Sequence, residues 1–548
     1  MNNPITSFGK QLKREFHGYN AKIMQKDIMA GITVAAVSLP LALAFGASAG
    51  ADAAAGLITA IISAFVIGGL SGTSYQISGP SGATAAILIP VAMHYGMTGI
   101  LATGLMAGVI LILAGIFKLG KVVSFLPAPV LAGFTSGIAL IIALGQIENF
   151  LGVTAEGGKT IQKIIYLFRH GFKPNLYAVS IAMLMILFII MWPKKWGAKL
   201  PASLVGLVLI TGMNMIVNFP VTTVGKIPQT LLHENRILFA DVMTIPWREF
   251  LVPAFSIAAL CMIESLLCVV VAGRMKGERV NGNQELIAQG VANIIIPLIG
   301  GVPTAAVLAR TGVNIKSGQM TRIAGMVQGV VLLCSMFLLT PIMSEIPLSA
   351  LAGVLIMAAW RMNDWEGIRY MFKRRFRWAA TNFLITMIGT IVFDLAIAIA
   401  IGVSISILHF LVRMASIDIE INTIDEEKED KKIECAKNIS NDATVMYITG
   451  PIFFGSLNKL MREIEQHATG TLILSMHDVS LIDTSGVQAI MEFYEKNKQD
   501  GNCIVFASMQ KNVWKMFHKA GVLEMVGEKA LFDTAKEAIE TCTLQKQD

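Results

Sequence analysis

Residues 76–88 read Gln-Ile-Ser-Gly-Pro-Ser-Gly-Ala-Thr-Ala-Ala-Ile-Leu, and this stretch decides the fold. A cluster of Ser, Gly and Pro at residues 78–82 interrupts the chain, and a short apolar segment follows directly. Breaks of this kind inside a membrane protein are tolerated only where the backbone is buried in protein or lines a cavity. The stretch therefore predicts a half-length helix that begins in the interior of a membrane domain.

The same pattern recurs 220 residues later in the chain. Residues 83–88 read Ala-Thr-Ala-Ala-Ile-Leu, whereas residues 303–308 read Pro-Thr-Ala-Ala-Val-Leu and follow Gly300-Gly301-Val302. Corresponding Gly/Pro-broken segments in two halves of a chain indicate the binding site of a transporter. The alternative is a chance match, since Thr-Ala-Ala is common in apolar helices.

The composition of the whole chain agrees with a membrane protein. Of its 548 residues, 54% are hydrophobic and 15% are charged, and the mean hydropathy is +0.64. Soluble domains carry about 25% charged residues. This deficit excludes a disordered protein, a nucleic-acid binder and an ordinary soluble enzyme, and it assigns membrane lipid as the surroundings of the chain.

Fourteen apolar segments are predicted to cross the membrane, since a spanning helix needs about 20 apolar residues. Ten are long and four are short or broken. In chain order they cover residues 28–50, 53–70, 80–95, 97–117, 122–147, 176–192, 200–219, 250–273, 286–302, 304–313, 323–343, 347–360, 379–393 and 395–412.

Lysine and arginine residues separate the two sides of this membrane domain. The N-terminal segment and the loops that follow even-numbered segments carry twenty-one, whereas the opposite loops carry seven. Cytoplasmic loops carry the excess of positive charge. We therefore expect a multi-pass protein of the cell inner (plasma) membrane with both termini in the cytoplasm.

The two breaks belong to segments three and ten, which are seven positions apart, an odd offset, so the two copies run in opposite directions. We expect the N-termini of two half-helices to face each other there, with unsatisfied N–H groups and partial positive charge that suit an anion. The residues expected to bind the anion are Ser78, Gly79, Ser81, Gly82, Thr304, Ala305, Ala306 and Arg310.

Two ionisable residues lie inside apolar runs near this predicted site. Glu264 is midway along residues 250–273, where a carboxylate serves as a proton relay or ion ligand, or else makes a hydrogen-bonded helix contact. Arg310 adds positive charge to the anion site in one interpretation and marks the cytoplasmic end of the short helix in the other. For Glu264 and for Arg310 alike, the functional and the structural interpretation stay open at this point.

These residues and several motifs resemble the sulfate permease family, the SulP transporters with a C-terminal STAS domain. Residues 27–46 read Asp-Ile-Met-Ala-Gly-Ile-Thr-Val-Ala-Ala-Val-Ser-Leu-Pro-Leu-Ala-Leu-Ala-Phe-Gly and are similar to its first helix. Further matches are Gln-Ile-Ser-Gly-Pro-Ser-Gly at 76–82, Glu-Ser-Leu-Leu at 264–267, Asn-Gln-Glu-Leu at 283–286 and Arg-Thr at 310–311.

The resemblance implies an α-helical polytopic fold with a seven-plus-seven inverted repeat, divided into a core and a gate domain. It also implies an anion site between helices three and ten, homodimers and elevator-like alternating access. Family substrates include sulfate, bicarbonate, chloride and dicarboxylates. The predicted domains are a cytoplasmic segment at 1–27, the transporter at 28–412, a linker at 413–442 and a STAS domain at 443–545.

Departures from the family pattern bear on the coupling ion. Many sulfate-carrying relatives have Pro-Gln in helix one, where this chain has Pro40-Leu41. The motif sequences of this chain more closely resemble the bacterial branch that includes sodium-dependent bicarbonate transporters. That branch has Asp at the position of Glu264 and Thr at the position of Leu308. Because leucine cannot ligate sodium, we predict that Glu264 carries a coupling proton, with sodium as the alternative.

The tail beyond residue 443 alternates short apolar strands with amphipathic helices, which predicts an α/β domain. Strands are expected at 445–449, 471–476 and 503–507, and helices at 457–466, 485–498 and 513–520. The loop at 478–486 resembles the STAS signature, in which small bacterial relatives are phosphorylated at a serine matching Ser485. A regulatory role for Ser485 competes with simple capping of the helix.

The predicted function is secondary transport of an inorganic anion such as sulfate or bicarbonate, or of a small dicarboxylate, with a proton as coupling ion. The alternatives are a sodium-coupled bicarbonate symporter, an uncoupled channel or exchanger, a nucleobase permease of related fold and a membrane sensor that signals through the tail. No nucleophile–base pair, Walker loop or metal spacing occurs in the sequence. We therefore predict no enzyme activity, catalytic residue, cofactor, metal or nucleic-acid partner.

Overall fold

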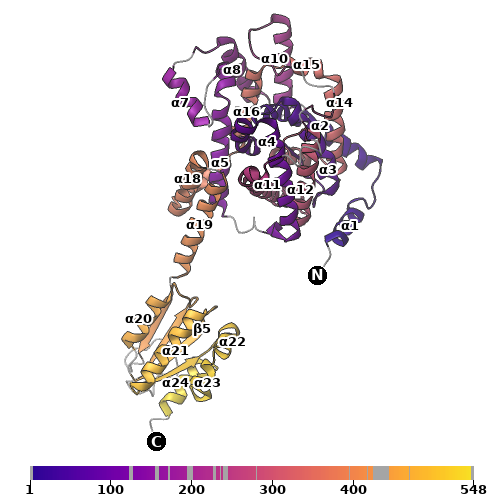
Figure 1. Ribbon diagram of the computed structural model, residues 1–548. Coiled ribbons are helices and arrows are strands. Elements are labelled where there is room, and N and C mark those ends of the chain that lie inside the picture. Colours follow the sequence, from indigo (N-terminus) through magenta and orange to yellow (C-terminus); the bar gives the residue numbers. More distant parts are fainter. Residues whose placement is uncertain are drawn as a thin grey trace. The chain divides into compact units, whose positions relative to one another are not determined.

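The computed structural model describes residues 4–121, 127–154, 160–170, 173–193, 201–225, 230–234, 236–237, 245–278, 280–393, 395–415, 417–423, 443–467 and 470–544. The chain divides into two compact units, Met1–Val403 and Ser404–Asp548. Each unit is described by itself (Figure 1).

Helices of the first unit form two packed groups. The first group, called the core group, contains α2 (Ala21–Ser48), α3 (Ala53–Leu70), α4 (Gly82–Ile116), α11 (Trp247–Lys276), α12 (Gly282–Ile299), α13 (Leu308–Lys316) and α14 (Ile323–Leu338). The second, called the gate group, contains α5 (Ala128–Gly145), α8 (Leu176–Met191), α10 (Ala202–Val217), α16 (Leu348–Met362) and α18 (Arg377–Val392).

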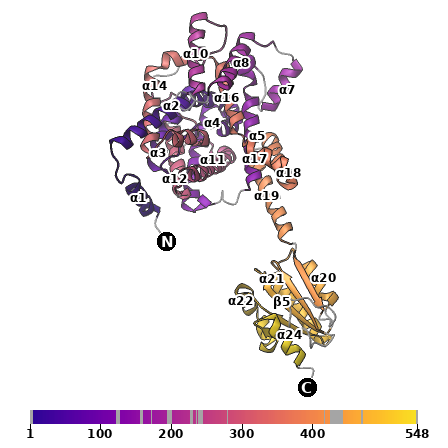
Figure 2. The same ribbon diagram turned by 180° about the vertical axis from the view of Figure 1, so that it is seen from behind.

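Shorter helices connect or flank these groups: α1 (Pro4–Glu15), α6 (Ile147–Leu151), α7 (Thr160–His170), α15 (Thr340–Ser344) and α17 (Trp365–Lys373). The last helix of the apolar region is α19 (Leu395–Met414). Figure 2 shows from behind that α18 lies beside α5 and that α12 lies beside α3, as in the first view.

Glycines let the core helices approach closely. A Cβ atom at Gly56 of α3 would lie 2.1 Å from the carbonyl oxygen of Ala42 in α2, and one at Gly108 of α4 would lie 2.7 Å from that of Gly290 in α12. Small residues are common at helix contacts in membrane proteins. Lipid is as apolar as the side chains, so the hydrophobic effect does not drive the helices together and close packing must do so. The many glycines of the sequence thus have a packing role.

The described part of each of the fourteen predicted apolar segments contains helix, although the tenth, 304–313, is helical only from Leu308. Segments 80–95 and 97–117 correspond to the two helical parts of α4, which meet at Gly96, where the backbone is not helical (φ 62°, ψ −154°). Only glycine adopts this backbone conformation at low cost. The helix therefore kinks where the sequence predicts a loop.

Among the described residues, six helices are both long and apolar enough to cross a membrane. They cover Ala21–Ser48, Ala53–Leu70, Gly82–Ile116, Ala128–Leu151, Trp247–Lys276 and Ile397–Met414. Four shorter apolar helices, α8, α10, α14 and α16, accompany them. The total of fourteen spans stays a prediction.

A polar contact joins the end of α2 to a loop that follows α10. Asp52 caps α3 through the N–H of Ala55 at 2.7 Å, and its other oxygen lies 2.6 Å from Nε2 of His233. The N–H of His233 donates to the carbonyl of Ile299, and Gly300 beside it has φ +98°. A side chain at Gly300 would collide with His233.

This pair predicts a pH-dependent stability. The hydrogen bond that His233 donates to Asp52 raises the pKa of His233 above 6.5. Burial raises the pKa of Asp52, but the hydrogen bonds that it accepts lower this pKa below 3.8 overall. The contribution of His233 to folding stability is complete below its unfolded pKa and is lost as the pH rises through its raised folded pKa. The contribution of Asp52 is complete above its unfolded pKa and is lost as the pH falls through its lowered folded pKa. The pair thus stabilises the folded protein most between pH 3.8 and pH 6.5.

We expect the melting temperature of the wild type to fall as the pH rises from 6.5 through the raised pKa of His233. Asp52→Asn keeps an oxygen for the Ala55 N–H but removes the charge, so its melting temperature should fall less steeply over that interval. Thermal unfolding in detergent measures both. Parallel slopes in the two proteins would contradict the assignment.

The second unit is a five-stranded sheet with helices on both faces. Its strand order is β3 (Asp418–Thr423), β4 (Ala443–Thr449), β5 (Thr471–Asp478), β6 (Cys503–Ala507) and β7 (Leu531–Phe532), with β3 antiparallel to β4 and the other pairs parallel. Its helices are α20 (Leu457–His467), α21 (Thr484–Gln499), α22 (Lys511–Lys519), α23 (Val522–Val526) and α24 (Ala535–Leu544).

Alternation along the central strands decides which helix covers which face. Leu472 and Leu474 of β5 pack with residues of α20, α21 and α22, whereas Ile473 packs with α24. Successive side chains of a strand point to opposite faces, so a fully apolar strand implies cover on both. Three of these strands match the predicted ranges, whereas β3 lies within the range predicted as a linker. The charged run at 425–432 is outside the described residues.

Candidate functional site

The two predicted breaks lie directly against each other. Residues Ser78–Gly79 form β1 and Ala305–Ala306 form β2, an antiparallel pair in which Ser78 is opposite Ala306 and Gly79 is opposite Ala305. All four residues are buried. Antiparallel pairing is the local arrangement that two oppositely directed copies of a repeat require.

One expectation is wrong in detail. We predicted that Thr304–Ala306 would be the start of a half-helix, but Ala305 and Ala306 are extended, and α13 begins at Leu308. The reason is that their backbone hydrogen-bonds across to β1 and continues with the N–H of Val307 donating to the carbonyl of Ile77 at 2.9 Å. The first break does end at a helix start, because α4 begins at Gly82.

Ser81 connects this helix start to Glu264. Ser81 is the N-cap of α4 and accepts a hydrogen bond from the N–H of Thr84 at 3.2 Å. Its hydroxyl also lies 3.0 Å from Oε2 of Glu264, which is half-buried on α11. The structure therefore brings the predicted coupling residue into contact with the predicted anion site.

Thr304 is held in place by an amide side chain of α12. Its N–H donates to Oδ1 of Asn293 and its carbonyl accepts from Nδ2 of the same residue, both at 2.9 Å. The N–H of Ala306 donates to the hydroxyl of Ser265 at 3.2 Å. Because polar side chains satisfy these backbone groups, the second break is stable without helical structure.

Arg310 is fully buried in the first turn of α13 and points to the first break. Its Nη2 donates to the carbonyl of Pro80 at 3.4 Å. Within the described part of the chain, its Nε and Nη1 atoms have no hydrogen-bond partner. A buried charge without a partner is costly, so a site that retains one indicates an anion as its counterpart.

Arg310 therefore lies beside the breaks and not at the far end of α13, which was the other interpretation of its position. The contact is tight, since a Cβ atom at Gly79 would lie 2.3 Å from Nη1 of Arg310. Neither Arg310 nor Glu264 takes part in the ion pairs of the described residues. A guanidinium and a carboxylate thus flank the same pair of strands without neutralising each other.

A second polar group reaches the site from α12. Nε2 of Gln289 donates to the hydroxyl of Ser78 at 2.7 Å and to Oε1 of Glu285 at 3.0 Å, and the other oxygen of Glu285 accepts from Ser71. Glu285 and Gln289 are fully buried. This chain of hydrogen bonds orients Ser78, one of the predicted anion ligands.

The sequence analysis did not select Ser265, Gln289 or Asn293. A usable signal exists for the last two, because Gln289 and Asn293 are four residues apart in an apolar helix and so share one face. Polar residues that repeat on one face of a membrane helix point to a partner inside the protein. Ser265 belongs to the Glu-Ser-Leu-Leu motif at 264–267, but a serine in an apolar helix is common and the motif alone assigned it no role.

Replacement of Gly79 with alanine tests this geometry. We expect about tenfold weaker substrate affinity, since the added methyl group forces the guanidinium of Arg310 aside, and a forced contact costs about 1–3 kcal/mol. Gly69→Ala is the matched control, because its Cβ would meet only Met326 Cε at an ordinary 3.5 Å. Transport assays on both variants decide, and equal behaviour of the two would contradict the site.

Ser485 lies at the second position of α21 and is half-buried. The cap of this helix is Asp483, whose side chain accepts a hydrogen bond from the N–H of Gly486 at 2.7 Å. Ser485 is thus not needed as the cap, and a phosphate at this helix start would be electrostatically favourable. Phosphorylation of Ser485 stays a prediction.

The helical membrane unit, its paired breaks and the α/β tail define a class, that of membrane transporters with a STAS domain. The sulfate permease family domain matches residues 24–389, and a STAS domain matches residues 434–538. The chain belongs to the sulfate permease family.

Individual relatives span nearly the whole chain. The chain is 34% identical over 537 residues to the putative sulfate transporter YvdB of Bacillus subtilis, with 94% of this chain and 98% of the relative covered. It is 29% identical to the transmembrane domain of a cyanobacterium bicarbonate transporter, BicA, with a TM-score of 0.63 over 70% of this chain and 98% of that one.

A second solved structure supports the fold alone. The murine anion transporter Slc26a9 in its inward-facing state has a TM-score of 0.86 and 17% identity, and the match covers 98% of this chain and 95% of that one. The resemblance to a helical transporter with a STAS domain is therefore confirmed.

Proposed function

We propose that the protein is a secondary active transporter of a small inorganic anion such as sulfate or bicarbonate, or of a small dicarboxylate. The observation that carries this proposal is the fully buried guanidinium of Arg310 beside the paired strands β1 and β2, where two of its nitrogens have no hydrogen-bond partner among the described residues. The helix start at Gly82 adds partial positive charge on the same side. The names of YvdB and BicA support sulfate and bicarbonate as the first anions to test.

We infer that transport proceeds by elevator-like movement of the core group against the gate group. All predicted ligands belong to core elements, and glycine contacts make that group tight, which supports movement as one body. The protein is proposed to lie in the plasma membrane as a homodimer with both termini in the cytoplasm. Chemical cross-linking in membranes and protease protection of terminal tags test the last two statements.

A proton is the proposed coupling ion, with Glu264 as its carrier. The contact between Glu264 and Ser81 supports it, because a change of charge at Glu264 is felt at the N-cap of α4. Sodium is the alternative, and the similarity to BicA favours keeping it in the test. Leu308 disfavours a sodium site at the start of α13, because hard cations need oxygen ligands and leucine has no side-chain oxygen.

The decisive experiment is uptake into proteoliposomes of labelled sulfate, bicarbonate and fumarate, with and without proton or sodium gradients. We expect saturable uptake of one anion against its own concentration gradient when an inward proton gradient is imposed. Uptake that only dissipates an anion gradient would instead identify a channel or an uncoupled exchanger. Specific binding without flux would favour a sensor that signals through the STAS domain.

A further inference from the structure

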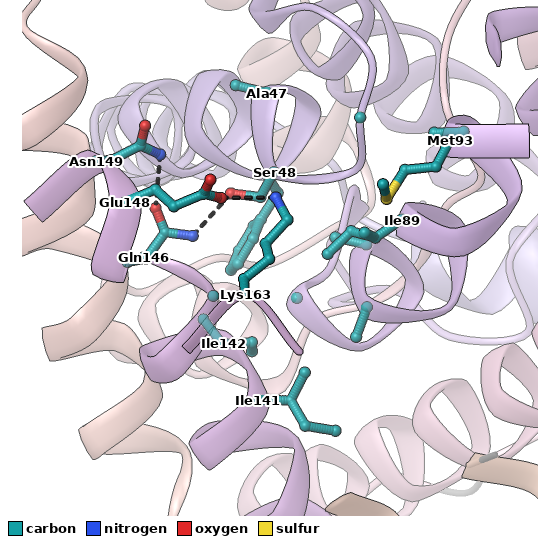
Figure 3. Close-up of a pocket in the computed structure, with 17 residues that line it drawn as sticks. Ala47, Ser48, Ile89, Met93, Ile141, Ile142, Gln146, Glu148, Asn149 and Lys163 are labelled. Carbon is teal, nitrogen blue, oxygen red and sulfur yellow. Dashed lines mark hydrogen bonds and ion pairs between the residues drawn. The ribbon is translucent and has the colours of Figure 1, made fainter. Parts of the chain in front are cut away.

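A cavity of about 380 Å³ lies between the core and gate groups, near the ends of α2 and α5 (Figure 3). Gly82, Ala85 and Ala86 of α4 form one wall, and Phe45 and Ile142 form parts of the others. Because Gly82 directly follows Ser81, the cavity reaches the edge of the candidate anion site. Water occupies ~30 Å³ per molecule in the liquid, so a small anion fits there together with several waters.

The mouth of this cavity is polar. Nζ of Lys163 lies 2.6 Å from Oε2 of Glu148, and Nε2 of Gln146 donates to the hydroxyl of Ser48 at 3.1 Å. Asn149 donates to Oε1 of Gln146 at 3.3 Å. Figure 3 shows these side chains together on one side of the cavity, with Lys163 extended toward Glu148.

The described residues that line the cavity include one ion pair. Among the described residues that line the cavity, Lys163 carries the only positive charge and Glu148 the only negative one. Their side chains are 28% and 23% exposed. Ion pairs that remain partly in contact with water are weak, because water screens the attraction and ordering two long side chains costs entropy.

An anion in the cavity can therefore exchange with Glu148 as the partner of Lys163. The exchange replaces one anionic partner with another and leaves the ammonium group paired at every stage. Gln146 and Asn149 supply amide N–H groups beside it, which a small oxyanion can also accept. Phe45 and Ile142 line the cavity beside Gly82, next to the candidate anion site.

We propose that Lys163 is the first binding position for the transported anion on its way to Arg310, and that Glu148 holds this position until the anion displaces it. The inference rests on the proposed function. With the N-terminus in the cytoplasm, the end of α2 at Ser48 faces outward, so the position acts on anions that arrive from outside. The ligand class is a small inorganic anion or carboxylate.

Initial rates of labelled sulfate and bicarbonate uptake test the proposal, measured in intact cells and in inverted membrane vesicles. For the anion that the wild type carries, Lys163→Gln is expected to raise KM for uptake from outside about fivefold with little change in kcat, the effect of losing one charge contact at the surface. Lys163→Arg should restore the wild-type KM. Glu148→Gln should lower KM, since Lys163 then has no competing carboxylate.

Lys173→Gln is the matched control, because Lys173 is exposed, ten residues further on, and does not line the cavity. Its KM should equal that of the wild type. Raising the ionic strength should increase the KM of the wild type and affect Lys163→Gln less, since salt screens the attraction to the lost charge.

An unchanged KM in Lys163→Gln, a change matched by Lys173→Gln, or an equal change for transport from the cytoplasmic side would each overturn the proposal. A KM that rises in Glu148→Gln would do so too, because Glu148 would then assist and not compete. These failures leave wild-type uptake intact. Absence of wild-type uptake for every anion tested would instead reject the proposed function itself.

Discussion

Arg310→Gln is expected to lower anion uptake by about 100-fold, because truncating one partner of a buried charge contact costs about 2–5 kcal/mol. Glutamine retains a polar end near the carbonyl of Pro80 but removes the charge that faces Gly79. Arg310→Lys keeps the charge and loses the fork of donors, so it should retain part of the activity. Initial uptake rates in proteoliposomes measure both.

Folding must be separated from function in this experiment. Because two nitrogens of Arg310 are unpartnered among the described residues, removal of the buried charge should leave the melting temperature of the anion-free protein unchanged or higher. Added anion should raise the melting temperature of the wild type and not that of Arg310→Gln, since a ligand stabilises only the state that binds it. Wild-type uptake by a folded Arg310→Gln protein would remove Arg310 from the site.

The fold was largely predictable because apolar runs of about 20 residues are a strong signal of membrane-spanning helices. The breaks at 78–82 and 303–308 were visible as Gly/Pro interruptions, and their opposite directions follow from their places in segments three and ten, an odd offset of seven. The extended conformation of Ala305 and Ala306 was not predictable, because it depends on hydrogen bonds to Ser265 and to β1, which lie far away in the sequence.

Other features needed the three-dimensional arrangement. The orientation of Arg310 toward Gly79 was undecided in the sequence, since a residue in a short helix can face either end of it. The contact between Lys163 and Glu148 joins α7 to α6, two short helices in a region that the sequence assigned to a long loop between membrane segments. The strand β3 was missed because its apolar residues Ile419 and Ile421 alternate with polar ones next to a charged run.

Glu264→Gln is expected to separate anion exchange from proton coupling. Glutamine has the volume of protonated glutamate and still accepts a hydrogen bond from Ser81, whose hydroxyl lies 3.0 Å from the carboxylate in the wild type. An anion bound beside a charged Glu264 would be repelled, so uptake of a proton favours binding and its release favours dissociation. The variant is fixed in the uncharged state, and only the proton-linked part of the cycle should be lost.

Two measurements on the same proteoliposomes test this. Exchange of labelled against unlabelled anion should stay within about threefold of the wild type, since the hydrogen bond persists and its net worth is small. Acceleration of uptake by an inward proton gradient should disappear in Glu264→Gln and remain in Glu249→Gln, an exposed acid in the first turn of the same helix. Wild-type uptake that requires sodium and ignores the proton gradient would contradict the proposal, because Glu264 would then hold a metal cation and its amide variant should lose exchange as well.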